Sequence, residues 1–343
     1  MKLMTCKQAA TSVIALSALA VSFAADAHHT AAVFGSNTGG PITTIQATTA
    51  AQGTFIAGVN LQYVDFEQFS DAELADFAGR HIHAHSADYL LSPSLTAAYG
   101  VTDDFTVSVV LPYLIRHDLR AGEHSHSGGM AFNSAEKLGN VKGIGDLSIL
   151  GAYRFLNDDA NDFEAAVLFG VELPTGDTHE KSLHGERLET EHQPGSGSWD
   201  PSLGLALTKR IGDRVSLDAN VLYTFTGHGS QETELGDRYS YNASVSYRFA
   251  GERHEHEDGM VEWHSAWDFI LELNSHTEDQ QRIAGEIEAD TGGTYLLVSP
   301  GIRYTGQSAW SGYVSVGVPV FNDMGIAEPD LNLMLLAGFA KAF

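Results

Sequence analysis

Residues 331–343, at the carboxyl end of the chain, read LNLMLLAGFAKAF. Apolar side chains occupy alternate positions of this stretch, namely Leu331, Leu333, Leu335, Ala337 and Phe339. This period of two is typical of a β-strand with one apolar face. Many outer-membrane barrels end on such a strand with a terminal aromatic residue, here Phe343, because the last strand must pair with the first and leave no open edge. The stretch therefore predicts an all-β chain that closes into a transmembrane barrel.

The same alternation recurs along the chain in segments of about ten residues, the length that a tilted strand needs to cross a bilayer. We expect strands at residues 54–69, 87–101, 105–116, 147–155, 163–173, 200–207, 214–225, 239–249, 262–273, 296–304, 314–320 and 331–343. The pattern is clearest at 214–225 and 239–249. The sequence thus predicts a twelve-stranded antiparallel transmembrane β-barrel.

The connections between these strands alternate between short and long. Tight turns rich in Gly, Asp and Asn are expected at residues 101–104, 157–162, 211–213 and 304–309. Long polar connections are expected at residues 70–86, 117–143, 174–199, 227–236 and 275–293. Short periplasmic turns and long extracellular loops in this order are typical of outer-membrane barrels with an even strand number. A soluble β-sandwich is the alternative, but twelve strands of this length with such unequal loops argue against it.

The start of the chain has the features of a secretory signal. Lys2 and Lys7 precede an apolar stretch at 13–23, and a small-x-small site ends at Ala27, so residues 1–27 are expected to be cleaved. The only cysteine, Cys6, would leave with them. Residues 28–52, rich in Thr, Ala and Gly, have no barrel pattern and would either plug the lumen or extend into the periplasm. Residues 53–343 would form the barrel.

The formal charge of −25 argues against nucleic acid as a partner, because phosphates require a basic surface. An acidic excess suits cations, or the divalent ions that bridge lipopolysaccharide, and it also keeps loops soluble. No later stretch approaches the length of about 18 apolar residues that a membrane-spanning helix needs. We expect a location in the bacterial outer membrane, with lipid, lipopolysaccharide, the barrel-assembly machinery and a small cargo as partners.

Three stretches carry a family resemblance. They are GIGDLS at 143–148 continuing to YRF at 153–155, ELPTGD at 172–177, and GSGSWD at 195–200 leading into LGLA at 203–206. They resemble the outer-membrane family named for the MetA pathway of phenol degradation, and the similarity extends from about the first strand to the last. The resemblance implies a barrel and a role in transport. This chain departs from the family pattern at Lys341, where an aromatic residue is expected, and in its histidine-rich loops.

Sixteen histidines are present, and eleven fall in the expected outer loops. Neutral imidazole is the usual nitrogen ligand of zinc, copper and nickel. The expected metal ligands are His81, His83, His85, His124, His126, His179, His184 and His192. The other loop histidines are His117, His228 and His276, and the accompanying glutamates include Glu189 and Glu191. Transient zinc or copper ions are one interpretation, and simple solvation of the loops is the other. No resident cofactor is expected.

A second set of charged residues is expected in the lumen, because ionised groups face away from lipid. The set is Glu164, Glu172, Asp218, Arg248, Glu262, His264, Asp268 and Glu272. An acidic lining would favour cations. Alternatively, Arg154, Arg214, Arg248 and Arg303 would neutralise the carboxylates in a network that fills the lumen.

A twelve-stranded barrel is narrower than a sixteen-stranded porin, so a channel through it would pass single small solutes. We expect a channel or transporter whose cargo is divalent metal cations or small aromatic and hydrophobic compounds. The alternative is a non-conducting barrel that binds surfaces or serves as a scaffold. A lipid hydrolase is less favoured, because no strand sets serine, histidine and an orienting amide on the lipid face. The chain is therefore not expected to be an enzyme.

Overall fold

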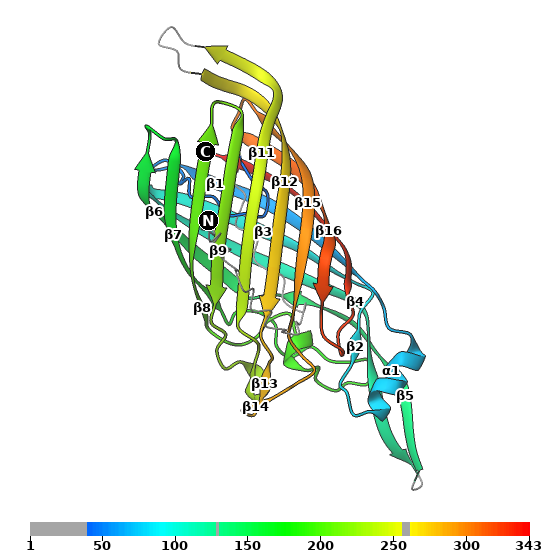
Figure 1. Cartoon of the computed structure of the whole chain (residues 1–343). Helices are drawn as coiled ribbons and strands as arrows, with labels where there is room; N and C mark the ends of the chain where they lie inside the picture. Colours follow the sequence, from blue (N-terminus) through cyan, green and yellow to red (C-terminus); the bar gives the residue numbers. More distant parts are fainter. Residues whose placement is uncertain (1–39, 128–129, 256–260) are drawn as a thin grey trace, which may run out of the picture.

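Twelve antiparallel strands close into one barrel in a computed structural model that describes residues 40–127, 130–255 and 261–343 (Figure 1). They are β1 (Phe55–Phe66), β3 (Tyr89–Thr102), β4 (Phe105–Ser127), β6 (Leu147–Asp158), β7 (Phe163–Leu173), β8 (Asp200–Ile211), β9 (Val215–Thr224), β11 (Arg238–Glu255), β12 (Val261–Glu278), β15 (Gly293–Gly306), β16 (Trp310–Asp323) and β17 (Leu331–Ala342). The predicted fold class is confirmed. The expected signal peptide at 1–27 lies outside the described residues.

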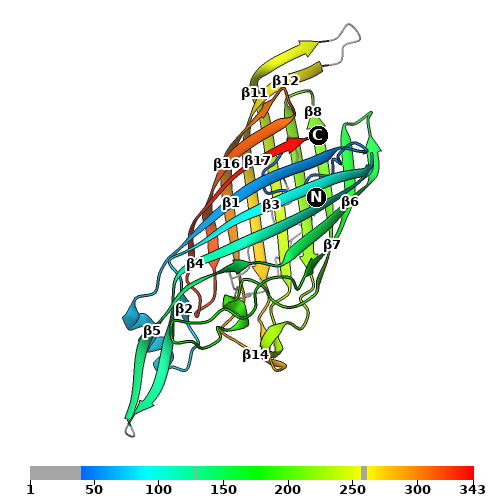
Figure 2. The ribbon, with the colours of Figure 1, turned by 180° about the vertical axis from the view of Figure 1, so that it is seen from behind.

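The last strand closes the barrel, as the alternation at the carboxyl end predicts. Figure 2 shows β1 between β17 and β3, and Ile56 of β1 lies opposite Ala342 of β17. Beyond the last pair, the N–H of Phe343 donates to the carbonyl of Phe55 at 2.8 Å, and that of Phe55 donates back at 3.2 Å. Both edges of the sheet are therefore satisfied, which a barrel in lipid requires. No helix in the described part of the chain is long and apolar enough to span a membrane.

Side chains alternate between the outer and inner faces of each strand. In β12, Trp267 and Phe269 are 41% and 47% exposed on the outer surface, whereas Asp268 and Glu272 are 3% and 0% exposed inside. Apolar groups can face lipid at no desolvation cost, and charged groups cannot. The alternation therefore places an apolar surface outside and a polar lining inside.

The two ends of the barrel differ, as expected. Residues 103–104, 159–162, 212–214 and 307–309 connect strands at one end, which we call the turn end. The opposite, loop end carries α1 (Asp71–Gly79), β2 (His85–Ser86), β5 (Met130–Ile144), η1 (Thr190–His192), η2 (Ser230–Glu232), β10 (Thr233–Glu234), β13 (Arg282–Ile283) and β14 (Glu286–Ile287) (Figure 1). In outer-membrane barrels the long loops face the cell exterior.

Two loop boundaries predicted from the sequence are wrong. Residues 117–143 form no irregular loop, because β4 continues to Ser127 and pairs with β5 in a hairpin that extends beyond the barrel. Similarly, β12 continues to Glu278, so His276 lies on a strand and is 5% exposed. Apolar alternation ends where the bilayer ends, but backbone pairing can continue past that point. A prediction based on alternation therefore stops such strands too early.

The connections at the loop end fold over the barrel mouth. We call residues 67–88, 174–199, 225–237, 279–292 and 324–330 the loop cap. Leu188 and Met324 of this cap are 4% and 0% exposed and belong to one apolar cluster with Leu119 of β4 and Tyr295 of β15. Burial of such side chains stabilises each by about 1.5–3 kcal/mol. The loop cap is therefore packed against the strands.

Candidate functional site

Several of the inward-facing acidic side chains are engaged with arginine. Glu164 accepts from the guanidinium groups of Arg154 at 3.0 Å and Arg210 at 3.3 Å. Asp268 accepts from both Nε and Nη2 of Arg248, at 2.8 and 3.0 Å. The fork of arginine matches two carboxylate oxygens, so this pair is a strong one.

The remaining described members of the predicted lumen set are also paired. Arg238 lies 3.5 Å from carboxylate oxygens of both Glu172 and Asp200. Asp218 accepts from the hydroxyls of Thr208 at 2.7 Å and Ser216 at 2.8 Å. The side chains of Glu262 and His264 lie outside the described residues.

The arrangement resembles the neutralised network that the sequence left open as an alternative. Arg154 and Arg248 pair as that alternative proposed, whereas Arg210 and Arg238 were not foreseen. Arg210 of β8 reaches Glu164 of the adjacent strand β7, whereas Arg238 of β11 reaches Asp200 of β8 and Glu172 of β7, which are not its neighbours in the sheet. Such pairs depend on strand register and on the curvature of the barrel, which the sequence did not define.

Residues 40–52 lie inside the barrel, where charged side chains of the wall hold their backbone. Glu272 accepts from the backbone N–H groups of Ile42 at 3.2 Å, Thr43 at 3.0 Å and Thr44 at 2.9 Å. Arg303, which is fully buried, donates to the carbonyl of Pro41 at 2.6 Å. A carboxylate that accepts several N–H groups makes charge-assisted hydrogen bonds, which are stronger than neutral ones. Charged groups of β12 and β15 thus anchor the start of the segment.

The segment then crosses to the opposite wall. The N–H of Ile45 donates to Asn220 at 2.8 Å, that of Ala47 to Thr208 at 2.9 Å, and that of Ala50 to Thr106 at 2.8 Å. Hydrogen bonds to strands β9, β8 and β4 in turn show that residues 40–52 traverse the lumen. We call them the lumen segment.

The lumen segment separates two cavities. The outer chamber, towards the loop end, has a volume of about 120 Å³ and is lined by Thr43 and Ile45 of the segment together with wall residues that include Leu222, Tyr239, Asn242 and Tyr295. The inner chamber, towards the turn end, has a volume of about 460 Å³ and is lined by Thr48 of the segment with Arg210, Arg214, Arg248 and Asp268. The outer chamber thus combines apolar and polar side chains with the Arg238, Glu172 and Asp200 cluster at its wall, and the inner one is lined mainly by charged side chains.

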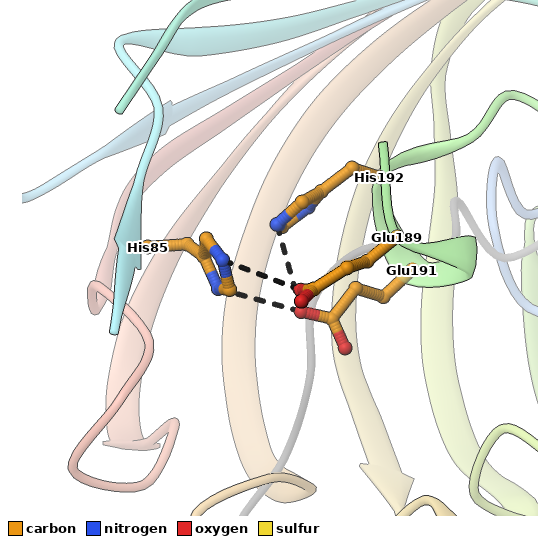
Figure 3. Close-up of side chains that lie close together, drawn as sticks. All are labelled: His85, Glu189, Glu191 and His192. Atoms are coloured by element: carbon orange, nitrogen blue, oxygen red, sulfur yellow. Dashed lines mark ion pairs between the residues drawn. The ribbon is translucent and has the colours of Figure 1, made fainter. Parts of the chain in front are cut away.

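A separate cluster lies at the loop end, where His85 of β2 meets Glu189, Glu191 and His192 around η1 (Figure 3). One ligand atom from each of the four lies within 4.8 Å of the others. His85 Nδ1 is 3.4 Å from Glu191 Oε1, and His85 Nε2 is 3.4 Å from Glu189 Oε2. His192 Nε2 is 3.5 Å from the same Glu191 oxygen. We call these four residues the mouth cluster.

Local structure holds both sides of the mouth cluster. On one side, β2 pairs with β4, and the N–H of His85 donates to the carbonyl of Ala327 at 3.0 Å. On the other side, Arg116 donates to the carbonyl of Glu191 at 3.3 Å, and Gln281 donates to its carboxylate. His85, Glu191 and His192 are 6%, 4% and 1% exposed, and Glu189 is exposed. The cluster is therefore preorganised and mostly excluded from water.

The other histidines predicted as metal ligands are distributed over the loop end. His81 and His124 contact each other with ring centroids 5.0 Å apart, and His184 lies 3.1 Å from Glu136. His83 and His179 are exposed, and the side chain of His126 lies outside the described residues. Among the predicted ligands whose side chains are described, the structure gathers His85 and His192 into one cluster with two glutamates. Arg116 and Gln281, which support them, were missed because their sequence neighbourhoods carry no metal-site pattern.

A closed barrel with an apolar outer surface and a polar lumen defines the class of outer-membrane β-barrel proteins. The family model described as "Putative MetA-pathway of phenol degradation" matches residues 119–320. The chain belongs to this family, as its three motifs predicted.

One solved structure supports the fold, and two further barrels are similar at lower scores. An outer membrane channel from Pseudomonas putida F1 superposes with a TM-score of 0.58 at 16% identity, covering 87% of this chain and 98% of that one. The CymD monoaromatic hydrocarbon channel gives a TM-score of 0.43 at 9% identity, with 86% and 89% of the two chains covered. The KdgM porin gives 0.42 at 9% identity, with 83% and 99% covered. No curated protein matches the chain significantly.

Proposed function

We propose that this protein is an outer-membrane channel for small uncharged solutes with an apolar part, such as single-ring aromatic molecules. The outer chamber is the observation that carries the proposal. Its volume of about 120 Å³ is close to the cavity of about 150 Å³ that holds benzene in a protein core. Leu222 and Tyr295 offer apolar surface, and Asn242 offers hydrogen bonds. A site that is mostly apolar with a few polar groups is typical of small-molecule binding.

Metal cations are less suited as cargo of the lumen. Arg154, Arg210 and Arg248 lie against its carboxylates and offset the negative field that would attract a cation. The description of the family refers to phenol degradation, which agrees with a single-ring cargo. The proposal assigns no catalytic step to the chain.

A non-conducting scaffold is the second candidate, and the lumen segment favours it because this segment obstructs the interior. Current recordings in planar bilayers separate the two candidates. A channel gives a small ionic current that a phenolic solute interrupts reversibly, whereas a scaffold gives no current with or without the solute.

The solute site is tested by substitution in the outer chamber. Asn242→Trp fills the chamber and is expected to abolish the solute-dependent interruptions. Tyr241→Trp is the matched control, because the adjacent side chain is 53% exposed on the outer surface. Interruptions that persist in Asn242→Trp would contradict the proposed site.

A further inference from the structure

The spacing of the mouth cluster is that of a metal coordination shell. Zinc binds nitrogen and oxygen ligands at about 2.0–2.1 Å, so two ligands of a tetrahedral ion are about 3.3 Å apart. Glu191 Oε1 lies 3.4 Å from His85 Nδ1 and 3.5 Å from His192 Nε2. These separations are longer than ordinary hydrogen bonds, which fall at about 2.7–3.2 Å. Glu191 Oε1 therefore already has the separation from one nitrogen of each histidine that a shared ion requires, and the ligand atoms of the whole cluster lie within 4.8 Å of one another.

We propose that the mouth cluster binds one divalent transition-metal ion of the zinc type. His85 Nδ1, Glu191 Oε1 and His192 Nε2 are the protein ligands, and the fourth position is left to water. Imidazole and carboxylate donors together suit zinc, copper and nickel rather than calcium or magnesium, which prefer oxygen alone. Metal binding at the mouth cluster does not depend on whether the lumen conducts.

Glu189 supplies the outer contact that such sites usually have. A histidine that binds metal through one nitrogen normally donates its other N–H to a carboxylate, which fixes the ring and its tautomer. His85 Nε2 faces Glu189 Oε2 at 3.4 Å, while His85 Nδ1 faces the proposed ion. Glu189 is therefore a positioning residue for His85.

Arg116 contacts His192, one of the proposed ligands, and this contact has to change when the metal ion binds. Its Nη1 lies 3.4 Å from His192 Nδ1 and 3.3 Å from the carbonyl oxygen of Glu191. When His192 Nε2 binds metal, the proton of the neutral ring is on Nδ1, so Nδ1 can no longer accept a hydrogen bond from Arg116. Metal binding is thus expected to shift this guanidinium.

The ion would join two parts of the loop cap that are far apart in sequence. His85 lies in the connection before β3, and η1 lies in the connection between β7 and β8 (Figure 3). Both pack on the apolar cluster that contains Leu188 and Ala87. A metal bridge here would fasten the loop cap over the barrel mouth.

Calorimetry of the untagged, full chain in detergent with ZnCl₂ tests the proposal. We expect one equivalent of Zn²⁺ to bind with a Kd of about 1 μM. The double variant His85→Gln/His192→Gln is expected to lose at least a hundredfold in affinity. Because buried substitutions can impair folding, Glu189→Gln is measured in parallel. Loss of an outer-shell partner reduces metal affinity by about 10- to 100-fold.

The matched control is His81→Gln/His124→Gln, which removes another contacting histidine pair from the loop end. It should bind zinc within twofold of the parent chain. Heat-dependent migration on gels checks that each variant forms the barrel. The proposal is overturned if the parent chain binds no zinc tighter than about 1 mM. It is also overturned if the control loses as much affinity as the His85/His192 variant, or if Glu189→Gln binds like the parent chain.

Discussion

The substitution Glu272→Gln should release the lumen segment. Glu272 accepts three backbone N–H groups of residues 42–44, and each bond is charge-assisted. Hydrogen bonds to charged groups contribute about 1.5–3 kcal/mol and neutral ones about 0.5–1.5 kcal/mol. The loss is then about 1 kcal/mol for each bond, or about 3 kcal/mol in all. At 1.36 kcal/mol for each factor of ten, the released population rises on the order of a hundredfold.

Thiol labelling measures this population directly. Thr44 is fully buried. A cysteine introduced there therefore reacts with a maleimide only when the lumen segment detaches from the barrel wall and exposes this position to solvent. Cys6, the only cysteine of the chain, is replaced by serine for this assay. The labelling rate of Thr44→Cys should rise on the order of a hundredfold when Glu272→Gln is added.

Asp268→Asn is the matched control. It removes one negative charge from the same strand and the same face, but Asp268 pairs with Arg248 and not with the lumen segment. Labelling of Thr44→Cys should therefore stay slow in this variant. If the labelling rate of Thr44→Cys in the Glu272→Gln variant stays within about threefold of the rate in the parent, the anchoring argument is refuted. If Asp268→Asn raises the labelling rate equally, the release is a general effect of lost charge and not of the Glu272 hydrogen bonds.

Three further predictions test the other parts of the structure. A Cβ atom at Gly100 would lie 2.1 Å from the carbonyl oxygen of Ala51, so Gly100→Ala should displace residues 50–51 and speed the labelling of a cysteine at Ala50, whereas Gly212→Ala should not. Leu205, near the middle of β8, is 49% exposed, so Leu205→Lys should lower the free energy of unfolding in lipid vesicles by about 2–4 kcal/mol, and an effect below that of Leu205→Phe would contradict the outward orientation. Zinc affinity should fall as the pH is lowered from 8 to 5, because protons compete for the imidazole ligands, and a pH-independent affinity would exclude histidine ligands.

The strands could be predicted because lipid imposes one simple pattern on every one of them. The expected strand at 214–225 is observed as Val215–Thr224, and the other strand ends at the turn end are correct within four residues, except that β11 continues six residues past its expected end at 249, to Glu255. Where a strand leaves the bilayer that pattern disappears. This is why the extensions of β4 to Ser127 and of β12 to Glu278 were missed.

The mouth cluster could be predicted only in part. Histidine and glutamate in the loops indicated metal binding, but His85 and His192 are separated by more than a hundred residues, and no spacing rule connects them. Burial distinguishes them from His83 and His179, which are exposed. Burial of loop residues follows from how the loop cap folds on the apolar cluster around Leu188, and this depends on contacts between connections rather than on any local pattern.

In the proposed channel, the lumen segment and the loop cap would lie in series along one passage. The segment lies between the two chambers, and the cap packs on the strands at the loop end, beyond the outer chamber. Conductances in series are limited by the narrower one, so Glu272→Gln raises the ionic current only to the level that the loop cap permits. If zinc fastens the cap, a chelator should raise the current further in Glu272→Gln than in the parent chain. Equal effects of the chelator in both chains would show that the two closures do not act in series.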